Sequence, residues 1–315
     1  MKTTTYLFAA LTFIGFISCT KDVAFLHEKG LYNSLSDFYS ENGIPMQTYT
    51  IDNATGGNFT SPQGTFVSIP SNTFVDDNYN LISGNVTIEF KDLYKKSDML
   101  FANMPPTTNT GILKSAGEFY IKATYNNSNV WISSIKKITV TQPSFNQPID
   151  TSMRPFRFGQ DNVNNFVGGN QTWFYNPYDT LLTSTSNYIF SLYQFNNLSA
   201  LTGTWCNSDD PTYFSAFPQT ILTLHPKDSL KDFSVDVFLV FTGVNAMVHL
   251  SPDGIDFSYQ YAPIGLSCTA VALGVKDGHF YASFTPFTVG ANQTVNFSLQ
   301  QMSVADFKTQ LEALN

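Results

Sequence analysis

The chain has 315 residues, of which 43% are hydrophobic and 15% aromatic but only 13% charged, about half the charged share of typical soluble domains. Its formal net charge of −8, without any basic run, leaves no electrostatic basis for binding nucleic acid. This length allows about two or three domains of ordinary size, with a surface covered mainly by uncharged polar side chains.

The first predicted element is a secretory signal peptide over residues 1–18. A basic start precedes an apolar run from Tyr6 to Ile17, which is too short to span a bilayer as a helix. The run ends in Phe16-Ile17-Ser18-Cys19, which resembles the cleavage box of bacterial lipoproteins. That resemblance implies that Cys19 becomes the mature N-terminus and carries acyl chains such as palmitate, which together anchor a protein stably. The alternative is an ordinary cleaved signal with an incidental Cys.

Residues 19–45 are predicted to form a tether with one short helix, because Leu31, Leu35 and Phe38 stand at partly helical spacing. Thr20-Lys21-Asp22 resembles the Lys-acidic signal that carries lipoproteins of Bacteroidota to the outer leaflet of the outer membrane. We therefore expect a lipid-anchored outer-membrane protein that faces the cell surface. An ordinary solvated tether explains the same charges equally well, so the choice of leaflet stays open.

Residues 46–142 are predicted to form a β-sandwich. Apolar and polar side chains alternate in Val86–Phe90 and again from Phe119 to Tyr125. A period of two indicates strands with one buried face. Glycines and Asx residues between these runs supply the turns.

Four short motifs in this region follow one another in a recognisable order. They are Thr55-Gly56-Gly57, Gly64–Pro70, Asn72-Thr73-Phe74 and Gly84–Thr87. Together they resemble a ZU5-like β module, and the following residues, 97–119, are similar to uncharacterised lipoproteins of Bacteroidota. The resemblance implies a noncatalytic β-sandwich and supplies no active-site residues.

Residues 143–217 are predicted to be a loop-rich β segment, because prolines and a Gly-Gly pair interrupt any long element. Trp173, Tyr175 and Tyr178 stand here among Asn and Gly residues and are candidates for an exposed platform on which sugar rings stack. Burial in the core is the alternative for these aromatic residues, since they carry large burial energies.

Residues 218–315 are predicted to form an immunoglobulin-like or transthyretin-like β-sandwich of about seven antiparallel strands. Val235–Phe241 and Ile255–Tyr261 alternate apolar and polar side chains, and Asp-Gly pairs predict hairpins. Ser303 is placed to cap a closing helix over residues 303–314. The predicted fold is therefore all-β, with two or three antiparallel β-sandwich domains and a short C-terminal helix.

The cysteines beyond the lipid-attachment site are Cys206 and Cys268. In an oxidising compartment they could form one disulfide. Two separately buried thiols are the equally weighted alternative.

The sequence offers little catalytic chemistry. None of its four histidines stands within metal-ligand spacing of another His or a Cys, and no nucleophile elbow or phosphate-binding glycine loop occurs. Asp76-Asp77 and Asp209-Asp210 are compatible with a loose calcium site, but ordinary Asx turns explain them better. We therefore expect no metal, no cofactor and no enzyme activity.

Asp179-Thr180-Leu181 and Asp228-Ser229-Leu230 match the short Asp-Thr/Ser-apolar motif that resembles the O-glycosylation signal of exported proteins in Bacteroidota. If the motif is used, Thr180 and Ser229 must be exposed.

Two functions fit these patterns. The first is a noncatalytic binding or scaffold subunit of an outer-membrane protein complex, anchored in the membrane through its lipid. The alternative is a surface glycan-binding or adhesive lipoprotein that uses the aromatic platform.

Overall fold

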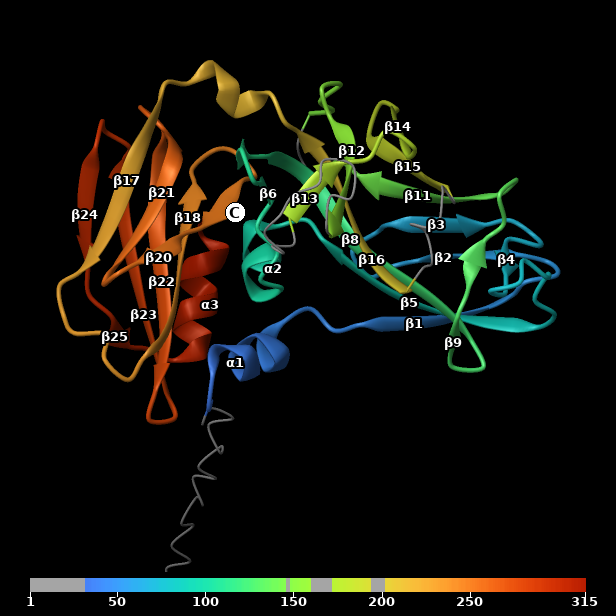
Figure 1. The fold of residues 1–315 in the computed structure, drawn as a ribbon, viewed down its shortest axis with the longest axis horizontal. Helices are drawn as coiled ribbons and strands as arrows, with labels where there is room; N and C mark the ends of the chain where they lie inside the picture. Colours follow the sequence, from blue (N-terminus) through green and yellow to red (C-terminus); the bar gives the residue numbers. More distant parts are fainter. Residues whose placement is uncertain (1–31, 146–147, 160–171, 194–201) are drawn as a thin grey trace, which may run out of the picture.

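The computed structural model describes residues 32–145, 148–159, 172–193 and 202–315, and shows two β-sandwiches with short helices at their junction (Figure 1). This arrangement confirms the predicted all-β fold with a short C-terminal helix. The predicted signal peptide, Cys19 and residues 20–31 of the tether lie outside the described residues. Residues 32–45 of the predicted tether are described, and Leu35 and Phe38 are buried in a core cluster, so this part is packed on the body of the protein and is not a free tether. Within the described ranges, no helix is long and apolar enough to cross a membrane.

The first sandwich packs a seven-stranded sheet against a five-stranded one. The larger sheet contains β1 (Gln47–Asp52), β5 (Asn85–Leu93), β8 (Lys114–Tyr125), β16 (Thr202–Asp210), β12 (Arg154–Gly159) and β13 (Thr172–Tyr175) in that order, with β9 (Ser128–Asn129) beside β8. The smaller sheet contains β14 (Thr180–Thr183), β15 (Asn187–Tyr193), β11 (Lys137–Pro143), β3 (Phe66–Ile69) and β2 (Gly57–Thr60). A two-stranded sheet of β4 (Phe74–Val75) and β10 (Trp131–Ile132) lies at the far end.

Period-two burial produces the core of this sandwich. Val86, Ile88 and Phe90 on β5 are fully buried and pack with β8, β11 and β15, as their alternation predicts. Residues 143–217 complete the same sandwich, because β12, β13 and β16 join its larger sheet and β14 and β15 its smaller one. The loop-rich segment is thus an integral part of the first sandwich.

The second sandwich has a four-stranded and a five-stranded sheet. The four-stranded sheet contains β20 (Ser251–Asp253), β21 (Asp256–Pro263), β17 (Gln219–Pro226) and β24 (Gln293–Phe297). The five-stranded sheet contains β19 (Met247–His249), β18 (Ser234–Phe241), β22 (Ser267–Lys276), β23 (His279–Thr288) and β25 (Gln300–Gln301). The 3₁₀ helix η1 (Tyr213–Ala216) lies in the connection from the first sandwich.

Two details of the prediction for this sandwich were wrong. β17 and β24 pair in parallel and not antiparallel. After β23 the chain crosses to the other sheet, where β24 lies beside β17, and no hairpin connects these two strands. Ile255 lies in the turn before β21 and is exposed, so it does not begin that strand's buried face.

The junction between the sandwiches is a layer of helices that covers the outer face of the second sandwich's five-stranded sheet. It contains α1 (Leu35–Asn42), α2 (Lys96–Phe101) and α3 (Val304–Glu312), and Figure 1 shows α2 and α3 between the sandwiches. Phe38 of α1 stacks on Phe280 at 4.5 Å between ring centroids, and Phe307 of α3 meets both rings edge-on. Ser303 caps α3 by accepting a hydrogen bond from the Asp306 N–H at 3.1 Å, as predicted.

This layer explains why β18 is not half-buried as its alternation predicted. Val237, Leu239 and Phe241 face the sandwich interior. Phe238 and Val240 point the other way and belong to the same hydrophobic cluster as the helix residues Phe38 and Phe307. All five of these β18 side chains are buried. A sheet covered on both faces has no polar face to alternate with.

Candidate functional site

A pocket of 660 Å³ opens between the two sandwiches. The first sandwich supplies β12, β13 and the hairpin of β6 (Thr107–Thr108) and β7 (Gly111–Ile112), while residues 211–219 and β21 supply the opposite side. Ligand pockets have volumes in this range and favour domain interfaces. We therefore treat the lining of this pocket as the candidate functional site and call it the junction pocket.

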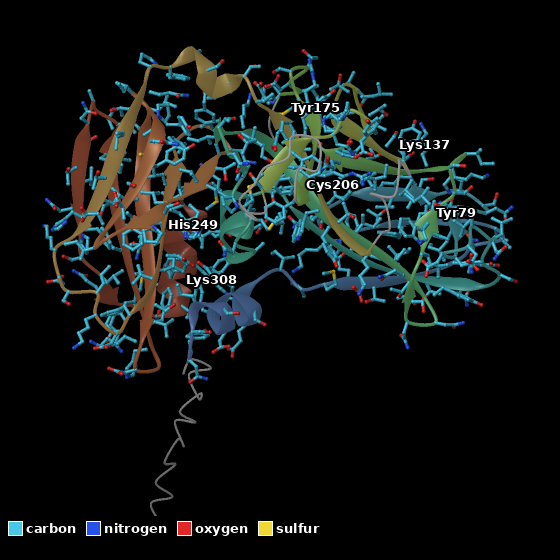
Figure 2. The ribbon with its side chains drawn as sticks, viewed as in Figure 1. Tyr79, Lys137, Tyr175, Cys206, His249 and Lys308 are labelled. Atoms are coloured by element: carbon cyan, nitrogen blue, oxygen red, sulfur yellow. The ribbon has the colours of Figure 1, made fainter. Side chains whose placement is uncertain are left out.

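Of the three aromatic residues predicted to stack sugars, two line the junction pocket. Trp173 is buried, and its indole Nε1–H donates to the Pro105 carbonyl at 3.1 Å, so it forms part of the fixed wall. Tyr175 is 53% exposed at the edge strand β13 (Figure 2). Tyr178 is also exposed, but it is not among the described residues of the lining. The predicted platform of three rings is therefore divided between the core, the pocket and the outer surface.

Arg154, at the start of β12, is the one charged side chain among the described residues that line the junction pocket. Its Nη1 donates to the carbonyl oxygens of Thr151 and Met153 at 3.1 and 2.8 Å. These two bonds hold the guanidinium against the turn that precedes β12. The rest of the described lining is aromatic, aliphatic or uncharged polar.

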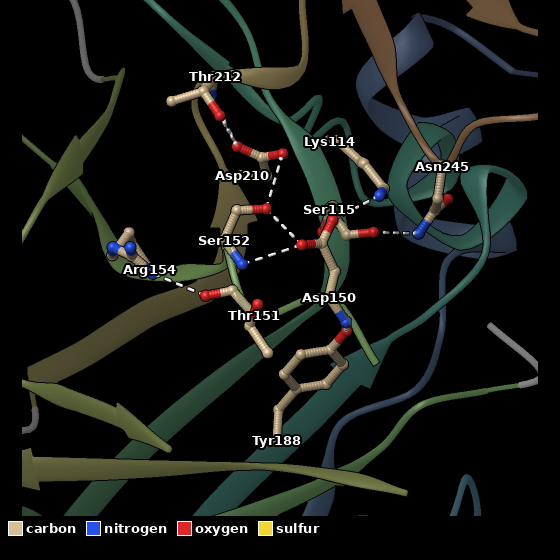
Figure 3. Close-up of polar contacts among 10 residues, drawn as sticks. All are labelled: Lys114, Ser115, Asp150, Thr151, Ser152, Arg154, Tyr188, Asp210, Thr212 and Asn245. Carbon is tan, nitrogen blue, oxygen red and sulfur yellow. Dashed lines mark hydrogen bonds and ion pairs between the residues drawn. The ribbon is translucent and has the colours of Figure 1, made fainter. Parts of the chain in front are cut away.

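The turn that holds Arg154 is fixed by a network of polar contacts (Figure 3). Asp150 accepts a hydrogen bond from Lys114 Nζ at 2.6 Å and others from the backbone N–H and hydroxyl of Ser152. Its own N–H donates to Tyr188 Oη at 2.8 Å. The network thus ties the turn to β8 and β15, one strand from each sheet.

Asp210 closes the network at the end of β16. It accepts hydrogen bonds from the N–H and hydroxyl of Thr212, and Ser152 Oγ lies 3.1 Å from its Oδ2. Asn245 of the second sandwich donates to the Ser115 carbonyl at 3.0 Å and accepts from the Ser115 N–H. Lys114 belongs to the network that holds the turn of Arg154, and the adjacent Ser115 makes the contact with Asn245 of the second sandwich.

Ser152 has two neighbouring carboxylates, but its surroundings do not suit a nucleophile. Burial raises the pKa of Asp150, yet hydrogen bonds from Lys114 and Ser152 outweigh it and lower the pKa to about 2. A general base works best with a pKa near the operating pH. Asp150 is thus a structural anchor and a poor base for activating the Ser152 hydroxyl.

Two further carboxyl groups are buried beside this network. Glu118 on β8 and Asp209 on β16 have no exposed surface, and burial raises the pKa of both well above their usual values. Ser115 Oγ donates to Asn207 Oδ1 at 2.7 Å, so its single proton is not available to Asp209. Protonation removes the charge that makes such groups costly to bury. The sequence favoured Asx turns for Asp209 and Asp210. This was wrong for Asp209, which is buried within β16, whereas Asp210 accepts from the Thr212 N–H as an Asx turn does.

Neither Asp pair that the sequence offered as a loose calcium site is arranged as one. Asp76 accepts hydrogen bonds from the N–H groups of Asn78 and Asn80 and forms an Asx-type turn, while Asp77 accepts from the Trp131 indole. Throughout the described ranges, no group of three or more His, Cys, Asp or Glu side chains is placed to hold a metal ion.

Cys206 and Cys268 are free and buried, which corrects the disulfide alternative. Cys206 lies in the core of the first sandwich and Cys268 in that of the second. Burial raises the pKa of Cys268 to about 12 and that of Cys206 even more. Two thiols in separate cores cannot approach to disulfide distance without unfolding.

The two predicted glycosylation residues, Thr180 and Ser229, are both exposed, as the motif requires. Asp179, next to Thr180, is instead buried in a bidentate pair with Arg157, at 2.6 Å from Nε to Oδ2 and 2.8 Å from Nη2 to Oδ1. Ser229 lines a second pocket of 720 Å³, at the far end of the second sandwich. Modification of either residue stays a prediction.

Sequence reasoning found Trp173 and Tyr175 but missed the remaining residues of the junction pocket. Arg154, Gln219 and Tyr261 come from three strands that are far apart in the sequence, and only the fold brings them to one cavity. The run Arg154-Pro155-Phe156-Arg157-Phe158, which places two arginines among aromatic residues, was the one available signal. No protein-family model and no curated protein matches this chain. The resemblance to ZU5-like modules and Bacteroidota lipoproteins therefore stays a prediction.

Proposed function

We propose that this chain is a lipid-anchored, noncatalytic protein of the outer membrane that binds a carbohydrate in the junction pocket. The observation that carries the proposal is the pocket itself, with an exposed Tyr175 ring at its edge and a buried Trp173 in its wall. A sugar ring presents an apolar face of C–H groups that an aromatic ring can cover. The anchor at Cys19 and the surface location rest on the resemblance of the N-terminal residues to lipoprotein signals.

The polar part of the lining suits hydroxyl recognition. Asn109 and Gln219 carry amides that both donate and accept hydrogen bonds, and Thr110 adds a hydroxyl. The Thr108 hydroxyl is engaged within the hairpin, where it accepts from the Thr110 N–H at 3.2 Å. A sugar hydroxyl also donates and accepts. The pocket thus combines one exposed ring with several uncharged polar groups, which is the usual composition of a specific small-ligand site.

Support for a noncatalytic role comes from the chemistry around the pocket. The Ser152 hydroxyl lies in a carboxylate network beside the pocket, and Asp150, which accepts its hydrogen bond, has a pKa of about 2. Glycoside hydrolysis requires two carboxyl groups across the bound sugar. The described lining contains none.

The proposal is tested by titrating the purified chain with a panel of neutral and acidic oligosaccharides in a calorimeter. We expect Tyr175→Ala to weaken binding of any hit about tenfold, which corresponds to about 1.4 kcal/mol. Tyr178→Ala is the matched control, because Tyr178 is an exposed tyrosine outside the described lining. Loss of binding in Tyr178→Ala with full binding in Tyr175→Ala would place the site elsewhere.

A second candidate function is docking on an outer-membrane partner protein through the far tip of the first sandwich. Asp76 fixes a turn there that presents Tyr79, which has a positive φ of 61°, and Leu81, with exposed fractions of 60% and 59%. Figure 2 shows Tyr79 at the end of the molecule away from the second sandwich. Rigid exposed aromatic side chains are frequent anchors of protein interfaces.

This second candidate is tested by purifying tagged full-length chain in mild detergent and identifying proteins that co-purify. We expect Tyr79→Ser with Leu81→Ser to remove a specific membrane partner, whereas Tyr175→Ala retains it. The same partners in both preparations would contradict docking through the tip.

A further inference from the structure

We infer that the carbohydrate bound in the junction pocket carries a carboxylate, as in a hexuronic or nonulosonic acid, and that Arg154 binds this group. The inference rests on the proposed carbohydrate-binding function and specifies its ligand class. It follows from the charge of the pocket, the unused hydrogen-bonding capacity of Arg154 and the rigidity of its support.

The described lining of the pocket has a charge opposite in sign to the net charge of the chain. The chain has a net charge of −8, yet the described lining contains one cation, Arg154, and no carboxylate. A cation that faces a concave wall without a counter-ion favours an anionic ligand. A neutral sugar would leave this charge without a partner when it displaced water from the pocket.

Arg154 has one edge of its guanidinium available. The carbonyls of Thr151 and Met153 occupy Nη1, and the described residues supply no hydrogen bond or ion pair to Nε or Nη2. These two nitrogens form the edge that pairs with a carboxylate through two parallel hydrogen bonds. Arg157, only three residues away, shows this geometry in its bidentate pair with Asp179. The contrast is that Arg157 pairs with a carboxylate of the protein itself, whereas no described carboxylate pairs with Arg154.

The support of Arg154 is rigid enough to orient that edge. The turn carrying the two carbonyls is held by Asp150, whose carboxylate bonds Lys114 and whose N–H bonds Tyr188 (Figure 3). A preorganised donor loses less entropy when its ligand binds. The exposed Tyr175 ring lines the same pocket, so one sugar can stack on the ring while its carboxylate pairs with Arg154.

The test compares trigalacturonate, glucuronate-containing disaccharides and sialyllactose with neutral partners of matched size, including methyl-esterified trigalacturonate and lactose. Titration calorimetry with the full folded chain measures each dissociation constant at constant ionic strength. We expect at least one acidic glycan to bind more than about tenfold tighter than its neutral partner. Hydrogen bonds to charged groups make differences of this size.

Two variants locate the charge. Arg154→Gln should reduce acidic-glycan binding about 10- to 100-fold and abolish the preference for the acid, while Arg154→Lys should retain part of it because the charge remains but the fork is lost. Lys137→Gln removes one positive charge from the exposed start of β11, outside the described pocket lining, and should change nothing. Far-UV circular dichroism and the melting temperature verify that each variant is folded.

The outcomes separate the inference from the proposed function. Equal binding of acidic and neutral glycans, sensitive to Tyr175→Ala but not to Arg154→Gln, would overturn the carboxylate inference and leave the carbohydrate function in place. No binding of any glycan by the folded chain would overturn both. Equal losses in Arg154→Gln and Lys137→Gln would show long-range charge attraction in place of a site, and would overturn the inference.

Discussion

The two sandwiches have the same architecture but very different interiors. Among the described residues, every buried charged side chain lies in the first sandwich or in α2, whereas the second sandwich buries only Thr220 and Thr269 among polar residues. The second sandwich has a dry core, with β18 and β22 buried on both faces. The first sandwich buries acids, amides and hydroxyls, among them Glu118 and Asp209 beside the junction network and Asn53 and Thr73 beside β4 at the far end.

This difference indicates a division of roles. Dry, close-packed sheets are stable without specific partners, whereas buried polar groups require positioned partners and fix one conformation. The end of the first sandwich that meets the junction carries Arg154 and its network, and the second sandwich closes the pocket as a rigid wall. The pocket therefore lies where one surface supplies chemistry and the other supplies shape.

The largest predicted effect is in the first sandwich. Asp179→Ala leaves the Arg157 guanidinium buried without a counter-ion, which should cost about 3–5 kcal/mol of unfolding free energy. Asp256→Ala is the matched control, because its pair with His225 is partly exposed and such pairs contribute about 1 kcal/mol or less. Chemical denaturation measures both. Similar losses in the two variants would show that burial of the Arg157 pair has no special weight.

A smaller but substantial effect is predicted in the second sandwich from packing alone. Leu239→Ala removes a fully buried side chain from the core between the two sheets and should cost about 2–5 kcal/mol. Ile255→Ala, in an exposed turn, should change stability by less than about 0.5 kcal/mol. Thermal and urea unfolding of both variants check this. A loss below about 1 kcal/mol in Leu239→Ala would contradict a tightly packed dry core.

The buried acids should make the first sandwich sensitive to pH in a direction opposite to that of most ion-paired proteins. The pKa of Asp209 is raised on folding, so the native state holds a proton that the unfolded chain releases. Stability should therefore fall as pH rises above the unfolded value of about 4. Asp209→Asn should gain about 1–3 kcal/mol at pH 7, and this gain should disappear near pH 3. Urea titrations from pH 3 to pH 8 measure it; a gain that is independent of pH would contradict a protonated Asp209.

The smallest effect is an expected absence of change on oxidation. In a Cys19→Ser background, Cys206 and Cys268 are each confined to one core, so an oxidant should leave the melting temperature unchanged. Their reaction with a thiol reagent then reports separately on the unfolding of each sandwich. Formation of an intramolecular disulfide in the native protein, detected by mass spectrometry, would contradict this placement.

Local patterns predicted much of the fold but little of the site. Alternation located β5, because Val86, Ile88 and Phe90 have one buried face, and Ser303 located the start of α3. The same rule failed for β18, because Phe238 and Val240 pack against helices from distant parts of the chain. Arg154 became a site residue only through the pairing of β12 with β16 and the approach of residues 211–219. Such proximity is a property of tertiary topology, and no local spacing encodes it.

The central claim, that both sandwiches form one ligand site, is tested most directly by hydrogen–deuterium exchange of the full chain with and without the tightest-binding oligosaccharide. The account predicts protection in peptides covering residues 108–113, 154–156 and 172–175 of the first sandwich, and in those covering 211–219 and Tyr261. Peptides at the far tip, around Tyr79, should exchange equally in both states. Protection confined to one sandwich, or centred on the second pocket around Ser229, would contradict a site at the junction.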